Sequence, residues 1–181
     1  MSGIFITKLT PENFGEGSLD GFVRHQVVNE CWRRTDSGMK LVPAPFVEDW
    51  SPAQKREIAG RMLENIRRGF IGVGAFDGGA LVGWALLGNE LIGAGGNYLE
   101  LVMFHVSEPY RNRGTGRRLF TEAVVAAAGA GAEKLFISAH SSKESQAAYK
   151  ALGCIPAEEF FAEAAEAEPY DIQLEFDLRK G

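Results

Sequence analysis

The chain has 181 residues, of which 45% are apolar and 24% are charged, and its formal net charge is −5 at pH 7. This size and balance are typical of a single globular domain, and they exclude a fibrous or disordered chain. The acidic charge argues against sequence-independent binding of nucleic acid, which depends on basic surfaces.

The first fifty residues predict a strand, a helix and a loop. Alternating apolar residues predict a strand over residues 3–9, and turn-forming residues follow over 11–17. Ser18 can cap a helix, because the apolar residues after it recur at helical spacing and would share one side. Those residues are Leu19, Phe22, Val23 and Val27. Residues 36–50 are rich in turn formers and predict a loop around a short extended piece.

A second helix and an antiparallel meander follow. Ser51 caps the helix, Gln54 closes a capping box, and Gly69 ends the helix. Three strands are predicted next, over residues 70–76, 80–87 and 98–106. A hairpin signal at 77–79 separates the first two strands, and a glycine-rich turn at 93–97 separates the last two.

The last third of the chain alternates helix and strand. The pattern predicts a helix over 116–128, a strand over 134–139, a helix over 142–152 and a last strand over 170–178. A sheet followed by strand–helix alternation indicates a mixed α/β (α+β) fold. Because no repeat or linker divides the chain, we expect one domain over residues 1–181.

Apolar runs and cysteines set further expectations. The longest apolar runs fall short of the roughly 20 residues that cross a bilayer, and the N-terminus lacks a basic-then-apolar signal pattern. We therefore expect a cytoplasmic protein without a membrane partner. Neither Cys31 nor Cys154 has the paired spacing of a zinc site, so we expect free thiols and no metal.

The segment 111–116, Arg-Asn-Arg-Gly-Thr-Gly, joins a predicted strand to a predicted helix. Glycines let backbone N–H groups converge there, and the helix start adds unpaired donors and a positive dipole end. The segment therefore predicts a pyrophosphate site, surrounded by Arg111, Arg113, Arg117 and Arg118. A dinucleotide fingerprint would need glycine at Leu119, and no Gly-Lys-Ser/Thr element follows Gly114 as a P-loop requires. A plain tight turn with solvated arginines is the alternative.

These residues resemble the signature of the GCN5-related N-acetyltransferase (GNAT) superfamily, Gln/Arg-x-x-Gly-x-Gly/Ala. Arg111, Gly114 and Gly116 satisfy every fixed position. The resemblance implies a mixed, mostly antiparallel sheet of about seven strands flanked by about four helices. It also implies that acetyl-CoA is the co-substrate, that the loop amides bind its pyrophosphate, and that its pantetheine lies along the splayed end of the preceding strand.

The resemblance assigns the coenzyme site residue by residue. In the family an asparagine near the position of Ser142 often binds the pantetheine or its phosphates. The cofactor-binding residues so implied are Phe104, His105, Val106, Arg111, Asn112, Arg113, Gly114, Thr115, Gly116, Arg117, Ser142 and Tyr149.

Tyr149 is the first candidate for the chemistry. It lies in residues 145–153, which resemble the family's Ala/Ser-x-x-x-Tyr-x-x-x-Gly helix, whose tyrosine protonates the coenzyme sulfur in many members. A phenol with a pKa of about 10 is neutral at pH 7 and can donate a proton to a departing thiolate. The alternative is a tyrosine that packs against the sheet, and the upstream loop motif favours the donor.

Glu100 is the second candidate, because a carboxylate inside the apolar run 98–106 is costly to bury unless it is exposed or functional. Some histone-type acetyltransferases of the superfamily carry their general base at this position, and burial would raise the pKa of Glu100 toward that role. A carboxylate that holds an arginine at the cleft mouth is the alternative. Strict alternation places His105 on the opposite face with Leu101 and Met103, where we expect a hydrogen-bonded core histidine.

Two regions are candidates for recognition of the acceptor. His25, Asn29 and Trp32 would share one side of the first helix and line a cleft, and a solvated helix face is the alternative. Glutamates surround Phe160 and Phe161 in the loop before the last strand, where they would favour a cationic amine or simply form a solvated acidic loop. They are Glu158, Glu159, Glu163, Glu166 and Glu168.

We therefore expect an N-acetyltransferase in which a primary amine of a small molecule or peptide attacks acetyl-CoA directly in a ternary complex. Glu100 would assist deprotonation of the amine, and Tyr149 would protonate the coenzyme. A non-catalytic acyl-CoA-binding or sensing domain is the alternative. Family members often dimerise through their last strands, so the resemblance leaves a homodimer open.

Overall fold

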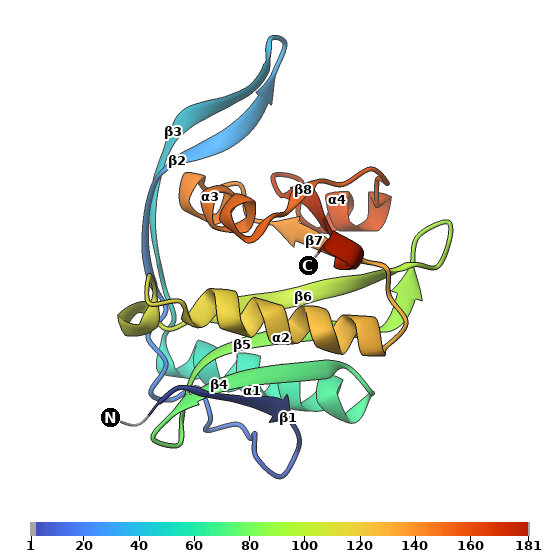
Figure 1. Cartoon of the computed structure of the whole chain (residues 1–181). Helices are drawn as coiled ribbons and strands as arrows, with labels where there is room; N and C mark the ends of the chain where they lie inside the picture. Colours follow the sequence, from blue (N-terminus) through green and yellow to red (C-terminus); the bar gives the residue numbers. More distant parts are fainter. Residues whose placement is uncertain (1–2, 181) are drawn as a thin grey trace.

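A computed structural model describes residues 3–180 of the chain (Figure 1). Its main strands are β1 (Phe5–Leu9), β4 (Ile71–Asp77), β5 (Ala80–Ile92), β6 (Tyr98–Val106), β7 (Lys134–Ala139), β8 (Ile155–Pro156) and β9 (Ile172–Asp177). Its α-helices are α1 (Pro52–Arg67), α2 (Thr115–Gly129), α3 (Lys143–Leu152) and α4 (Ala162–Ala167). Two further strands, β2 (His25–Thr35) and β3 (Gly38–Asp49), form a separate ribbon.

The seven main strands form one sheet in the order β1-β4-β5-β6-β7-β9-β8. Neighbouring strands are antiparallel except β6 and β7, which run parallel. The structure thus confirms the predicted mixed, mostly antiparallel sheet with helices around it. Residues 77–79 make the predicted hairpin, and Ser51 and Gln54 form the predicted capping box at the start of α1.

The sheet has two apolar faces with a helix on each (Figure 1). On the first, which we call the α2 face, Leu119 and Ala123 of α2 pack in one buried cluster with Leu99 and Leu135 of the sheet. On the second, the α1 face, a separate buried cluster joins α1 to β1 and β5. Alternation along each strand therefore decides which face a side chain reaches.

The predicted first helix is wrong. Residues 17–22 form turns, with N–H groups bonded three residues back, and Leu19 and Phe22 still reach the core of the α1 face. Gly15, Gly17 and Gly21 weaken a helix here, and the chain then continues as strand β2. Val27, expected in the helix's buried stripe, is 51% exposed.

The β2–β3 ribbon replaces both that helix and the loop predicted over residues 36–50. Its two strands pair from His25↔Asp49 to Thr35↔Gly38, and the hairpin extends beyond the main sheet (Figure 1). Near its start the backbone of Val23 is bonded to Ser107 and Glu108, and further along the Trp32 N–H donates to the Ser141 carbonyl. The ribbon thus connects the end of β6 to the end of β7.

Strands β6 and β7 stay together over three residues only. Tyr98, Leu99 and Glu100 pair with residues 134–136, and the rest of the two strands have no mutual pairing. A β-bulge at Val102 also interrupts β6, since Leu86 faces Met103 while Leu87 faces Leu101. The bulge reverses the alternation that follows, so Leu101 lies on the α2 face and Met103 on the α1 face.

A buried ionic network holds the paired end of these strands. The Glu175 carboxylate, 1% exposed, accepts hydrogen bonds from the Tyr98 hydroxyl at 2.6 Å and the Lys134 ammonium at 2.9 Å. It also accepts the backbone N–H of Glu158 at 3.0 Å. Because every group in the network has a partner, the buried charge is compensated.

We predict that Glu175→Ala lowers the free energy of unfolding by about 3 kcal/mol, because it leaves Lys134 and Tyr98 without their buried partner. The matched control is Glu158→Ala, which removes the other carboxylate that pairs with Lys134 and is 75% exposed. It should cost under about 1 kcal/mol. Urea unfolding monitored by circular dichroism measures both, and equal losses would contradict the assignment of the network to Glu175.

Candidate active site

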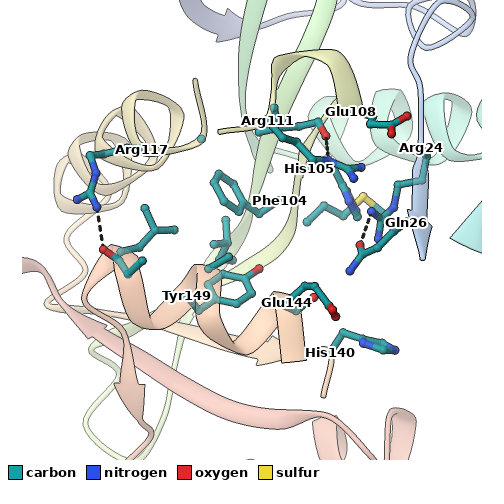
Figure 2. Close-up of a pocket in the computed structure, with 18 of the residues that line it drawn as sticks. Arg24, Gln26, Phe104, His105, Glu108, Arg111, Arg117, His140, Glu144 and Tyr149 are labelled. Carbon is teal, nitrogen blue, oxygen red and sulfur yellow. Dashed lines mark hydrogen bonds between the residues drawn. The ribbon is translucent and has the colours of Figure 1, made fainter. Parts of the chain in front are cut away.

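The divergence of β6 and β7 opens a cleft of about 1080 Å³. It is lined by the free end of β6, the start of α2, one side of α3, the end of β7, the segment just before β9, and the start of β2 (Figure 2). This volume is slightly above the range of about 300–1,000 Å³ that is usual for small-molecule and cofactor sites. The cleft can therefore hold an extended ligand together with a second, smaller one.

An anion cradle closes one end of the cleft. Gly114 precedes α2 with φ +83°, and Asn112 is also left-handed with φ +59°. The first N–H groups of α2 lack helical partners and carry the positive end of the helix dipole. The buried Thr115 Oγ1 has no hydrogen-bond partner among the described residues, and a Cβ on Gly116 would stand 3.7 Å from Val106. The residues present therefore fit a pyrophosphate held by backbone amides.

The arginines around the cradle have different roles. Arg111 turns inward, where its guanidinium donates to the Val106 carbonyl at 2.9 Å and to the His25 carbonyl at 2.7 Å. It therefore braces β2 against the end of β6, and its buried Nη2 is without a partner in the described chain. Arg117 lines the cleft and donates to the Ala151 carbonyl (Figure 2). Arg118 instead donates to the Ile4 carbonyl, so its predicted place beside the pyrophosphate site is wrong.

Tyr149 lies on α3 inside the cleft, as the sequence motif predicted. Its ring faces Phe104 of β6 with centroids 6.2 Å apart, and its hydroxyl points into the cleft (Figure 2). Burial, together with the nearby Cys154 and Asp171, raises the pKa of the phenol well above its usual range. Tyr149 is therefore protonated throughout the neutral range and can donate a proton or a hydrogen bond.

Glu100 lies beside the cleft and does not line it. Its strand segment still pairs with β7, at Glu100↔Phe136. Burial raises the pKa of the Glu100 carboxyl, in the direction expected from its apolar neighbours. The bulge at Val102 brings His105 to the same face as Glu100, so the predicted placement on opposite faces is wrong.

His105 lines the cleft against an aromatic cluster. Its ring is 5.0 Å from Trp50 and 5.1 Å from Trp84, measured between centroids. Burial, with the positive charges of Arg24 and Arg111, lowers the pKa of His105 to about 3. The imidazole is therefore neutral at physiological pH and is a weak base there.

The remaining predicted residues divide into two groups. Phe104, Val106, Asn112, Gly114 and Gly116 line the cleft as expected, and so does His25, although it lies on a strand rather than a helix. The residues that do not line it are Asn29, Trp32, Arg113, Thr115 and Ser142. Ser142 is fully buried, and its hydroxyl caps α3 by accepting the Ser145 N–H at 3.2 Å.

Several cleft residues were not singled out by the sequence. Arg24 lines the cleft and pairs with Glu48 at 2.5 Å. Asp171 and Ser138 also line the cleft, close in sequence or pairing to the loop whose five glutamates the sequence predicts to favour a cationic amine or to form a solvated acidic loop. Of those five only Glu168 lines the cleft, since two others bond elsewhere and two lie on α4. Arg24, Ser138 and Asp171 are far apart in the sequence, so the sequence did not show that they line one cleft.

Among residues 3–180, no group of three or more histidine, cysteine or acidic side chains is arranged to hold a metal ion. Within the same residues, no helix has the length and apolarity needed to cross a membrane.

Comparison with known proteins gives both a family and a fold. Residues 35–154 match the model of the Acetyltransferase (GNAT) family, whereas no curated protein matches the chain. The nourseothricin acetyltransferase structure has a TM-score of 0.68 at 15% identity, covering 97% of this chain and 98% of that chain. PaiA N-acetyltransferase from Thermoplasma acidophilum, solved with coenzyme A, has a TM-score of 0.62 at 20% identity, with coverages of 97% and 99%.

A third similar structure is the ribosomal-protein-S18-alanine N-acetyltransferase from Escherichia coli. Its TM-score is 0.57 at 15% identity, and the alignment covers 97% of this chain and 94% of that chain. These identities are low, so the structural likeness bears on the fold alone.

The cradle can be tested with two glycines that lie on either side of α2. Gly114 and Gly131 flank the helix with φ +83° and +88°, and neither added Cβ would clash. Alanine at either position should lower the free energy of unfolding by about 1 kcal/mol, because the left-handed backbone is strained for an L-residue. Only Gly114→Ala should weaken binding of inorganic pyrophosphate, measured by calorimetry. Equal weakening by Gly131→Ala would contradict a local cradle.

Proposed function

The chain belongs to the acetyltransferase (GNAT) family, and we propose that it transfers an acetyl group from acetyl-CoA to a primary amine of a small molecule or peptide. The observation that carries this proposal is one continuous cleft with an anion cradle at one end and the Tyr149 hydroxyl inside it. A cradle without a proton donor would support binding alone. The combination supports transfer.

The coenzyme would be bound by its two chemically distinct parts. Backbone amides at residues 112–116 and the start of α2 would hold the pyrophosphate, with Arg117 beside them. Beyond Glu100, β6 pairs with β5 on one edge only, so the backbone groups on its β7 side are open to a pantetheine chain lying alongside. Phe104 and Val106 line this part of the cleft. When bound, the coenzyme supplies the activated acyl thioester.

Direct attack in a ternary complex is favoured by the two-sided cleft. We call the gap between the free ends of β6 and β7 the split. Tyr149 and the start of α2 approach it from the α2 face, whereas Met103 and His105 line it from the α1 face. A coenzyme in the split would present its thioester to both faces. The amine can then enter from the α1 face while the thiolate leaves on the other.

Tyr149 would protonate the leaving sulfur. Its phenol is kept neutral by burial, and no described group accepts a hydrogen bond from it. Transfer of its proton to the thiolate would prevent the thiolate from attacking the new amide. Glu100, the predicted base, has a raised pKa and lies on the α1 face, but it does not line the cleft.

The acceptor class is proposed at the level of a primary amine. Similar structures include an enzyme named for the small molecule nourseothricin and one named for an alanine of a ribosomal protein. Residues 25–27 at the start of β2 line the cleft, and its volume leaves room for either a small molecule or a peptide end. A screen that follows release of free thiol from acetyl-CoA over alkyl diamines, aminoglycosides and short peptides identifies the acceptor.

We predict that Tyr149→Phe lowers kcat about 100-fold, because it removes the proton donor, while the affinity for acetyl-CoA stays within about twofold. Tyr170→Phe is the matched control, since Tyr170 is 68% exposed and does not line the cleft. Thiol release measures the first effect and calorimetry the second. An unchanged kcat in Tyr149→Phe would contradict the donor role.

The same measurements separate transfer from binding alone. A binding or sensing domain would bind acetyl-CoA and release no thiol with any amine of the screen. A phosphate-binding module would bind ATP as well as acetyl-CoA. Tight acetyl-CoA binding with turnover supports the transferase.

A further inference from the structure

Asp171 lies beside the cleft, where β7 ends and β9 begins. It directly precedes β9, whose first residue Ile172 pairs with Ala139 at the end of β7. The Ser138 hydroxyl donates to Asp171 Oδ2 at 3.1 Å, and the Asp171 N–H donates to the Glu168 carbonyl at 3.1 Å. Side chain and backbone are thus both held, and the carboxylate lines the cleft in a fixed position.

The carboxylate of Asp171 reaches the cleft from the α1 face. Ile172 and Leu174 pack in the cluster of the α2 face, so alternation sends Asp171 and Gln173 to the other side. The contacts of Gln173 agree with this, because its side-chain oxygen accepts the Phe161 N–H at 2.8 Å. The Phe161 ring in turn packs on Phe136, which alternation also places on the α1 face. Tyr149 stands on the α2 face of the same split. A donor and a carboxylate therefore face the split from opposite sides.

The histidines of the cleft are poor alternatives as proton acceptors. His105 is held neutral with its pKa lowered to about 3. His140 already uses the lone pair of Nδ1 to accept the Ser142 N–H at 3.0 Å, so its neutral ring carries the proton on Nε2. The Nδ1 of His25 is already paired with Asp49 Oδ2 at 3.0 Å.

The surroundings of Asp171 suit a carboxylate that exchanges a proton. Burial raises the pKa of its carboxyl, and the negative charge of Glu168 on the preceding loop acts in the same direction. The Ser138 hydroxyl on β7 and His140 just beyond it act in the opposite direction. Tyr149 on α3 also interacts with this charge. Only one oxygen of the carboxylate is bonded by Ser138, which leaves the other available to a ligand.

We propose that Asp171 binds the ammonium group of the acceptor on the α1 face of the split and takes its proton, directly or through one water. The inference rests on the acetyl transfer proposed above. The freed amine lone pair forms the C–N bond to the acetyl carbon, and the C–S bond breaks. The thiolate takes the Tyr149 proton, the second amine proton returns to Tyr149, and Asp171 releases its proton to solvent.

The test compares three carboxylate-to-amide variants with the best acceptor of the amine screen. Asp171→Asn should lower kcat/KM about 100-fold and abolish the fall in kcat/KM toward low pH that we expect of the wild type. Asp177→Asn, at the other end of β9 and outside the cleft, is the matched control and should behave as wild type. Glu100→Gln should keep the low-pH fall if Asp171 is the base.

Ser138→Ala provides a readout that a merely structural role would not give. Loss of its hydrogen bond raises the pKa of Asp171, because that bond favours the charged carboxylate. The low-pH fall in kcat/KM should therefore move to higher pH while the activity at its plateau is kept.

Calorimetry with acetyl-CoA and a thermal unfolding curve verify that each variant folds and binds coenzyme as the wild type does. A wild-type low-pH fall retained in Asp171→Asn, or lost in Glu100→Gln instead, would overturn the inference and leave acetyl transfer intact. Absence of thiol release by the wild type with every amine would overturn the proposed function and this inference together.

Discussion

Separation of β6 from β7 is the constraint on which the site depends. Parallel pairing holds the strands together from Tyr98 to Glu100, where the buried Glu175 network joins them to β9. Beyond Glu100 the strands diverge, and the bulge at Val102 turns β6 further. Backbone groups that a continuous sheet would have consumed are left facing a cleft. The β2–β3 ribbon bridges the two strand ends through Ser107 and Ser141, so the split has a defined width.

The two faces of the sheet give the split two different chemical environments. On the α2 face, the helix start and Tyr149 provide positive potential and a neutral proton donor. On the α1 face, the aromatic cluster around His105 and the carboxylate of Asp171 provide an apolar wall and a proton acceptor. In our proposal, coenzyme and amine meet in the split because each is matched to one face.

Sequence reasoning succeeded where the signal was local. The capping box at Ser51, the hairpin at 77–79 and the loop at 111–116 each place their cause within a few residues. The first helix failed because Leu19 and Phe22 keep helical spacing inside a chain of turns. The bulge at Val102 depends on pairing with β5, and the position of Asp171 depends on pairing with β7. Neither can be inferred from neighbours in the chain, since both arise from contacts between distant segments.

The central claim is that the split between β6 and β7 holds the coenzyme, with its acyl end beside Tyr149. A crystal structure of the chain with acetyl-CoA tests this most directly. We expect the pyrophosphate at the amides of residues 112–116, the pantetheine along residues 102–106 and the thioester sulfur within hydrogen-bond reach of the Tyr149 hydroxyl. Coenzyme bound outside the split, or a thioester remote from Tyr149, would contradict the account.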